Sequence, residues 1–99
     1  MKCDIRREEG TVAIVPSGRI GVAEAVELRH RLFPELTVGV LDVSLRMGEV
    51  TDLDSSGLGL LLALRNLCAD IGATFEIRDA GAWLEPKLDA VGLLSRKTT

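Results

Sequence analysis

The sequence predicts an α/β fold, in which strands and helices alternate along the chain and the central strands run mostly parallel. Two observations lead to this prediction. Short runs of β-branched and other apolar residues are separated by segments whose apolar side chains recur at helical spacing. In addition, residues 54–71 combine polar capping residues with an almost wholly apolar helix, which must be covered on most sides. We expect this helix to lie against a sheet.

The start of this helix is the most informative part of the chain. Asp54, Ser55 and Ser56 are residue types whose side chains accept hydrogen bonds from the free N–H groups of a first helical turn. Gly57 and Gly59 follow, and the missing side chains would let another surface approach the backbone closely. We therefore expect a helix tip that is polar and accessible.

The body of the helix is expected to be buried. Its apolar positions are Leu60, Leu61, Leu64, Leu67, Cys68 and Ile71. Gly72, just past the last of them, is the residue type that most often ends a helix.

Four strands are predicted from β-branched and alternating segments: residues 3–7, 11–15, 37–43 and 73–78. The first two are close enough in sequence to form an antiparallel pair. The polar residues 44–51 are interpreted as a loop, and so are residues 18–21. Arg19 in the latter segment is either a surface contact or an ordinary loop charge, and the sequence favours neither.

Two further helices complete the predicted order β, β, α, β, α, β, α. Residues 22–32 carry an apolar face of Ala25, Leu28 and Leu32, with Val22 leading into it. A short final helix is predicted within residues 81–91. It either begins at Pro86 or is kinked there, because proline is tolerated only in the first helical turn.

Length and charge limit the classes of function. The 99 residues are interpreted as one domain, residues 1–99. With 12 basic and 15 acidic residues, the net charge of −3 argues against nucleic-acid binding. No apolar run is long enough to span a bilayer, and the N-terminal residues lack the apolar core of a signal peptide. We therefore expect a cytoplasmic protein without direct membrane insertion.

Two familiar catalytic motifs fit the sequence poorly. Gly57, Leu58 and Gly59 begin like a dinucleotide-binding fingerprint, but Leu62 stands where the third glycine belongs. A serine nucleophile would lack the glycine two residues before it, and the only histidine, His30, lies on a different predicted helix. We expect neither enzymatic activity nor a cofactor.

A metal site is also not expected. Asp42 and Asp54 could meet at the carboxyl ends of strands and bind Mg²⁺, but helix capping is the favoured interpretation of Asp54. Cys3 and Cys68 lack the spacing of a metal pair. Cys68 falls on the apolar helix and is expected to be a small buried residue.

One string carries a family resemblance. Residues 50–59, Val-Thr-Asp-Leu-Asp-Ser-Ser-Gly-Leu-Gly, followed by three leucines, resemble the signature of the STAS domain, the sulfate transporter and anti-sigma factor antagonist family. The likeness extends over nearly the whole chain. Further similar segments are residues 16–20, 40–43, 72–77 and 91–93.

The resemblance implies a mixed four- to five-stranded sheet with helices packed mainly on one face. It also implies an anti-sigma factor antagonist whose first serine after the aspartate, Ser55, is phosphorylated by an anti-sigma factor with serine-kinase activity. The unphosphorylated form would bind that partner and release a sigma factor, and a phosphatase would reset the switch. The implied partner-binding residues are Asp54, Ser56, Gly57, Leu58, Gly59, Arg19, Ile20 and Gly21.

Two departures from the family pattern leave alternatives open. Gly21 stands where many members carry an acidic residue, and residues 44–51 are interpreted as an enlarged loop beside the switch. The short chain also resembles the small cytoplasmic STAS subunit of bacterial lipid-transport ATPases, which usually has threonine at the switch position. A stressosome-type scaffold is a third possibility.

Overall fold

The first two strands form an antiparallel hairpin, as predicted. In the computed structural model, which describes residues 2–93, β1 (Cys3–Glu8) pairs with β2 (Thr11–Pro16) along its whole length. Glu9 and Gly10 join the strands and have φ values of 41° and 86°. Two consecutive positive φ values are typical of the two-residue turn whose twist suits a hairpin.

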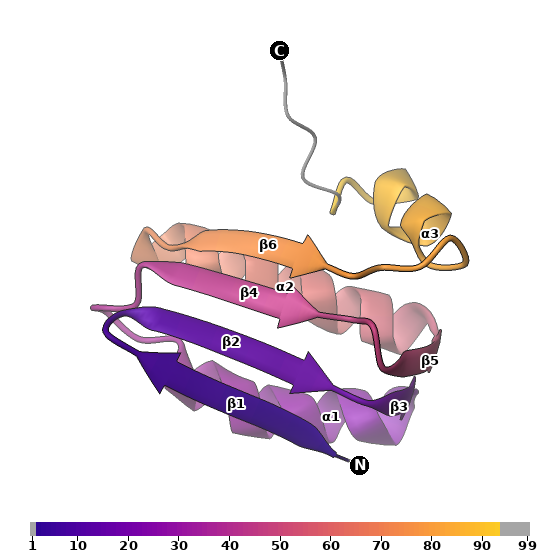
Figure 1. The fold of residues 1–99 in the computed structure, drawn as a ribbon, viewed down its shortest axis with the longest axis horizontal. Helices are drawn as coiled ribbons and strands as arrows, with labels where there is room; N and C mark the ends of the chain where they lie inside the picture. The colour runs from indigo at the N-terminus through magenta and orange to yellow at the C-terminus, as the bar shows by residue number, and fades with distance from the viewer. Residues whose placement is uncertain (1, 94–99) are drawn as a thin grey trace.

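Two parallel strands extend this hairpin into a mixed sheet. β4 (Asp42–Arg46) lies beside β2, and β6 (Thr74–Arg78) lies beside β4, which gives the order β1-β2-β4-β6 (Figure 1). The expected mixed sheet with parallel central strands is therefore confirmed.

Both long helices lie on the same face of this sheet (Figure 1). α1 (Val22–Leu32) has the predicted bounds, and α2 (Ser55–Ile71) ends at Gly72, which adopts φ 76°. The left-handed conformation of Gly72 is one that glycine adopts without steric cost. The prediction that helices pack mainly on one face is confirmed.

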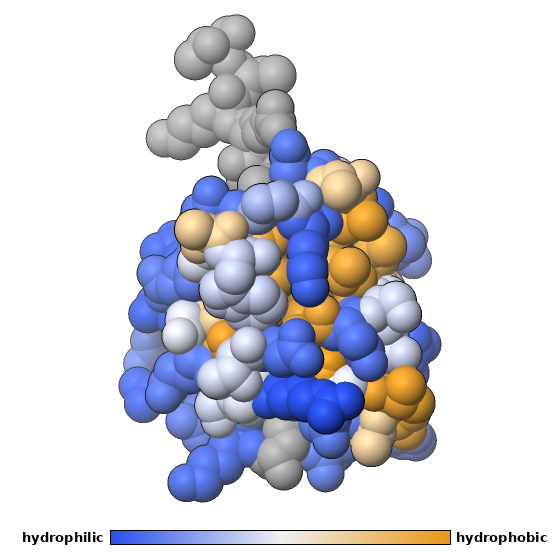
Figure 2. All heavy atoms as spheres, turned by 90° about the vertical axis from the view of Figure 1, so that its right-hand side faces the viewer, coloured by the Kyte–Doolittle hydropathy of each residue, from blue (hydrophilic) through white to orange (hydrophobic). Residues whose placement is uncertain are grey.

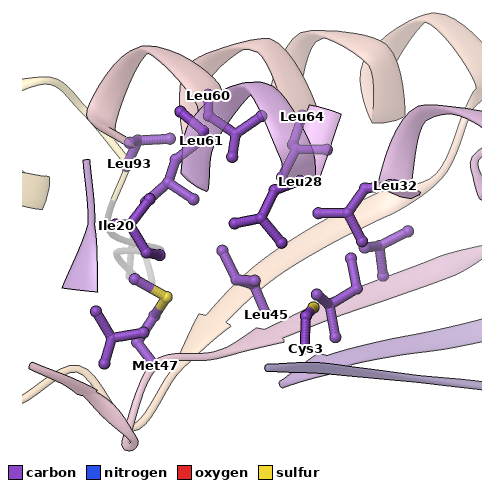
Figure 3. Close-up of a cluster of buried hydrophobic side chains, with 14 of the residues drawn as sticks. Cys3, Ile20, Leu28, Leu32, Leu45, Met47, Leu60, Leu61, Leu64 and Leu93 are labelled. Atoms are coloured by element: carbon purple, nitrogen blue, oxygen red, sulfur yellow. The ribbon is translucent and has the colours of Figure 1, made fainter. Parts of the chain in front are cut away.

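The core lies between the helices and the sheet. Alternate residues of β2 and β4 face the helices, and Val12, Ile14, Val43 and Leu45 are all buried. Figure 3 shows side chains from α1 and α2 converging on Leu45. The opposite face of the sheet carries Ser44, Arg46 and other polar side chains, because the period-two alternation of a strand sends them away from the core.

The strand predicted at residues 37–43 is displaced toward the C-terminus. β4 begins at Asp42, which pairs with Thr11, and a short 3₁₀ helix, η1 (Phe33–Glu35), precedes the intervening turn. Val38 is 91% exposed and Leu41 is 62% exposed. The prediction failed because apolar composition alone does not fix strand register, which here follows from pairing with the hairpin.

Residues 44–51 are not an enlarged loop, and that prediction is wrong. Their first part completes β4, while β5 (Val50–Leu53) pairs in parallel with β3 (Gly18–Ile20), which was also interpreted as loop. Only residues 47–49 connect β4 to β5. The segment is polar because one side of β4 faces solvent, whereas its alternate residues Leu45 and Met47 are buried.

The last helix is shorter than the predicted residues 81–91. α3 (Glu85–Ala90) has Pro86 in its first turn, so the alternative in which the helix begins at Pro86 is right to within one residue. Leu84, Leu88 and Leu93 are buried and attach this segment to the core. Across residues 2–93, no helix has both the length and the apolar character needed to cross a membrane.

Candidate functional site

Asp54 forms the cap of α2 and connects this helix to the two-stranded sheet of β3 and β5. Its Oδ1 accepts a hydrogen bond from the Gly57 N–H at 3.1 Å, and its own N–H donates to the Ile20 carbonyl at 3.2 Å. The backbone of Asp54 is extended, as a capping residue requires. Capping by Asp54 is thus confirmed, and the carboxylate is held beside the first turn of the helix.

Ser55 is the first residue of α2, and its side chain is exposed. The cap is made by Asp54, so the Ser55 hydroxyl is not used to satisfy the helix start. Ser56 is half-buried. Ser55 is therefore a hydroxyl at the positive end of a helix dipole that can be modified without breaking a contact of the fold.

Gly57 and Gly59 have different surroundings. Gly57 is buried, and a Cβ there would collide with the Leu53 side chain and lie 3.1 Å from Ile20 Cγ2. Gly59 is exposed, with nothing within 4 Å of the same position. Gly57 thus permits internal packing of α2 on β3 and β5, whereas only Gly59 leaves backbone open to another surface.

Ile20 and Gly21 also lie inside the molecule. Ile20 is 1% exposed and belongs to the core, so its predicted role as a surface contact is wrong. The sequence prediction missed this because it interpreted residues 18–20 as a loop. They form β3, and Ile20, its last residue, faces inward. Gly21 caps α1, and its N–H donates to Glu24 Oε1 at 2.8 Å.

The departure at Gly21 has a local structural consequence. A Cβ at this position would lie 3.1 Å from Glu24 Oε1 and 3.5 Å from Asp54 Oδ2. An acidic side chain there would bring a further negative charge toward two carboxylates, which destabilises by repulsion. Glycine avoids this crowding where the starts of α1 and α2 meet.

Arg19 is exposed and lies at this junction. Together with Asp54, it lines a shallow hollow above the start of α1. The other residues that line the hollow are Gly21, Val22, Ala23 and Glu24. Arg19 is thus a surface charge beside the α2 tip, which makes it available to a partner.

Three exposed apolar side chains lie near the starts of α1 and α2 but were not among the predicted partner-binding residues: Val22, Val26 and Trp83. Val22 is 65% exposed and Val26 is 53% exposed, so Val22 does not join the buried face of α1 as predicted. Their four-residue spacing places them together but off the stripe of Ala25, Leu28 and Leu32. Trp83 is 41% exposed. Figure 2, which views this end of the molecule, shows hydrophobic areas interrupted by hydrophilic ones.

α3 reaches the start of α2 through Lys87. The Lys87 ammonium donates to the carbonyl of Leu53 at 3.4 Å and lies 5.9 Å from the centre of the Trp83 ring. Leu53 is the residue before the cap. No sequence signal links these positions, because they are 34 residues apart and meet only through the tertiary fold.

The residues considered for catalysis or metal binding are dispersed. His30 is exposed on α1, and Asp42 stands at the beginning of β4, where it accepts a hydrogen bond from Thr74 Oγ1 at 2.7 Å. Asp42 and Asp54 do not form a pair. In the part of the chain that is described, no three His, Cys, Asp or Glu residues are grouped to hold a metal ion.

Both cysteines are buried and unpaired with each other. Burial raises the pKa of the Cys68 thiol to about 11, and it also raises that of Cys3. A raised pKa keeps a thiol protonated and chemically inert at neutral pH. This agrees with the structural role predicted for Cys68.

The family model described as "Mlab, STAS domain" matches residues 3–94. The chain belongs to the STAS family. Nearly the whole chain is matched, so the resemblance in residues 50–59 is confirmed as membership. Among curated proteins, none matches this sequence significantly.

Solved STAS domains of anti-sigma factor antagonists have the same fold. The unphosphorylated form of SpoIIAA is 16% identical with a TM-score of 0.79, over 99% of this chain and 90% of that one. SpoIIAA from Bacillus is also solved in its phosphorylated form, at 16% identity, a TM-score of 0.79 and coverages of 93% and 85%. A putative antagonist from Thermotoga maritima gives 20% identity and a TM-score of 0.82 over 92% and 79%.

The same fold occurs within a much longer transporter chain. A murine anion transporter of the solute carrier family is 14% identical with a TM-score of 0.70, over 86% of this chain but only 14% of that one. At these identities, the structural neighbours establish the fold of this chain.

Proposed function

We propose that this STAS domain is a phospho-switched binding module of the anti-sigma factor antagonist type. In this proposal the unphosphorylated form binds an anti-sigma factor with serine-kinase activity and frees a sigma factor in the cytoplasm. A phosphatase restores the binding form. The observation that carries the proposal is the exposed Ser55 hydroxyl, which stands at the tip of α2 and is not needed for the helix cap.

The geometry is suited to a switch that leaves the fold unchanged. A phosphate would add a charge of about −1.5 to −2 at the N-terminus of α2, where the helix dipole favours anions. The cap through Asp54 and Gly57 would remain. The new charge would stand beside the Asp54 carboxylate, so a partner that fits the unmodified surface would meet both added bulk and repulsion.

The proposed binding surface differs from the one that the sequence suggests, because it loses Ile20 and Gly57 and gains Val22 and Val26. The surface around the helix tip consists of Asp54, Ser56, half-buried Leu58, Gly59 and Arg19, and buried Gly21 lines the hollow beside it. Ile20 and Gly57 support that surface from below. Val22 and Val26 are exposed next to this surface and supply apolar area. The centre of most interfaces contains few charged residues, so such an apolar area suits a binding surface.

The phosphorylation site can be identified directly. We expect a kinase-type partner with ATP to modify Ser55, and mass spectrometry of the product locates the phosphate. Modification only at Ser56 or Thr51 would contradict the assignment. Ser55→Ala is the matched control, because it removes the hydroxyl and leaves the cap in place.

The switch itself is tested by recovery of partners from the native cell. We expect wild-type protein to retain a kinase-like ATPase and Ser55→Asp to lose most of it, because the carboxylate supplies part of the phosphate charge. Ser44→Asp, which adds the same charge on the far face of the sheet, serves as the control. Equal recovery of the kinase-like ATPase by wild type and Ser55→Asp would contradict the proposal.

A second candidate uses the same surface without a phosphate. The exposed Val22 and Val26 offer an apolar contact that does not depend on Ser55, as a permanent subunit of a lipid-transport ATPase would need. Recovery of a transporter ATPase by wild type and Ser55→Asp in equal amounts would favour this candidate over the antagonist.

A further inference from the structure

Lys87 is a cation that the fold holds at the residue before the α2 cap, close in the chain to the proposed phosphorylation site. Its ammonium donates to the carbonyl of Leu53, which is the last residue of β5 and stands two residues before Ser55. At 3.4 Å this bond is longer than a typical N–H···O bond. The ammonium has three donors, so a stronger acceptor nearby would compete well with the carbonyl.

The packing of α3 fixes where Lys87 can reach. Leu84 and Leu88 are fully buried, which anchors both ends of the first turn of α3 against the core. The Lys87 side chain is exposed and reaches the start of α2, and its ammonium lies 5.9 Å from the Trp83 ring centre. Lys87 is therefore positioned by the fold, while its four-carbon stem keeps the charged end free to turn.

A phosphate on Ser55 would need a counter-charge. Asp54 already places a carboxylate beside it. Arg19 lines the hollow beside the α2 tip together with Gly21 and Asp54, so it is a second cation near this site. Two residues of chain span at most about 7 Å, so the phosphate would form within the reach of a lysine held at the Leu53 carbonyl.

We propose that Lys87 is the counter-ion of phosphorylated Ser55. On phosphorylation, its ammonium leaves the Leu53 carbonyl and the Trp83 ring and pairs with the phosphate. The inference rests on the proposed function only in that Ser55 carries the phosphate. It makes α3 part of the switch, because modification of α2 then changes the surface at Trp83 as well as at the helix tip.

The test needs neither kinase nor partner. Phosphoserine is inserted at position 55 during translation, and the second ionisation of the phosphate is followed by ³¹P NMR against pH. We expect the phosphate pKa in Lys87→Gln to exceed the wild-type value by several tenths of a unit, the size typical of an exposed ion pair. Lys87→Arg keeps the charge and should restore the wild-type value. Arg6→Gln removes a charge from β1 and should leave it unchanged.

Trp83 provides a second readout, because it is the only tryptophan in the sequence. Its emission should differ between phosphorylated and unphosphorylated wild type, and this difference should disappear in Lys87→Gln. Lys87→Met, which keeps the apolar stem, replaces Lys87→Gln if circular dichroism shows the latter to be unfolded.

Three results would overturn the inference. They are equal phosphate pKa values in wild type and Lys87→Gln, an equal shift in Arg6→Gln, or no restoration in Lys87→Arg. A negative result here leaves the partner-recovery experiment intact. Conversely, the phosphate pKa could still depend on Lys87 if the cellular partner proved not to be a kinase. The two proposals therefore fail separately.

Discussion

At the scale of single residues, the tip of α2 divides its tasks between neighbours. Asp54 satisfies the helix start, Ser55 remains exposed, and Gly57 makes room for Leu53 and Ile20. This division allows a change at Ser55 to alter the surface while the fold is maintained. In many helices one serine both caps and is exposed, and its modification would then disturb the helix itself.

The division predicts unequal stability effects for two adjacent substitutions. Asp54→Ala should lower the free energy of unfolding by about 0.5–2 kcal/mol, because it leaves the Gly57 N–H without its acceptor. Ser55→Ala should change it by less than about 0.5 kcal/mol, as is usual for an exposed side chain without structural contacts. Urea unfolding of both variants checks this, and equal losses would show that Ser55 shares in the cap.

At the scale of elements, α2 is stabilised by one buried face and C-terminal capping. Leu64 and Cys68 are fully buried, whereas Leu62 on the same helix is half-buried. The helix is more apolar than a one-sided position requires, because α1, β6 and the segment after α3 all pack near it. Arg65, for example, donates to the Gly92 carbonyl at 3.1 Å.

Leucine truncations in α2 should separate the buried face from the half-buried one. Leu64→Ala should cost about 2–5 kcal/mol, because it leaves a cavity at the interface with α1 and the sheet. Leu62→Ala, the matched control, should cost clearly less, since part of its side chain already contacts water. Thermal unfolding of the two variants measures the difference. Indistinguishable melting temperatures would mean that α2 is not seated on the sheet in this orientation.

At the scale of the whole molecule, the sheet has one covered face and one open face. α1 and α2 cover one side of the sheet (Figure 1). The buried Leu45 faces them, while Ser44 and Arg46 lie on the other side. The starts of α1 and α2 meet β3, β5 and α3 at one end of the molecule. The proposed binding surface therefore lies at one end of the molecule and does not include the open face of the sheet (Figure 1).

Adjacent residues of β4 test this two-faced arrangement. Leu45→Asn should lower stability by several kcal/mol, because it buries an amide among apolar side chains with no partner provided. Ser44→Asn should change stability by less than about 1 kcal/mol, because its side chain reaches solvent. Denaturant unfolding compares the two variants, and a larger loss in Ser44→Asn would reverse the assignment of the faces.

Much of this architecture could be predicted from local sequence signals. The bounds of α1, the cap and end of α2, the hairpin and the buried state of Cys68 depend on interactions among residues that are near in the chain. Capping side chains, glycine in the left-handed conformation and helical apolar spacing act within a few residues, so they are visible before folding is considered. The exposed hydroxyl of Ser55 at the helix tip follows from the same signals.

Other features were decided only by contacts between distant segments. The register of β4 depends on pairing with β2, and the short pairing of β3 with β5 turned two predicted loops into strands. Ile20 and Gly57 were predicted as surface residues, but strand pairing and helix packing placed both in the interior. Lys87 reaches Leu53 across 34 residues of sequence. Sequence patterns carry periodicity and local chemistry, whereas register and long-range contacts depend on which surfaces the whole chain can bury together.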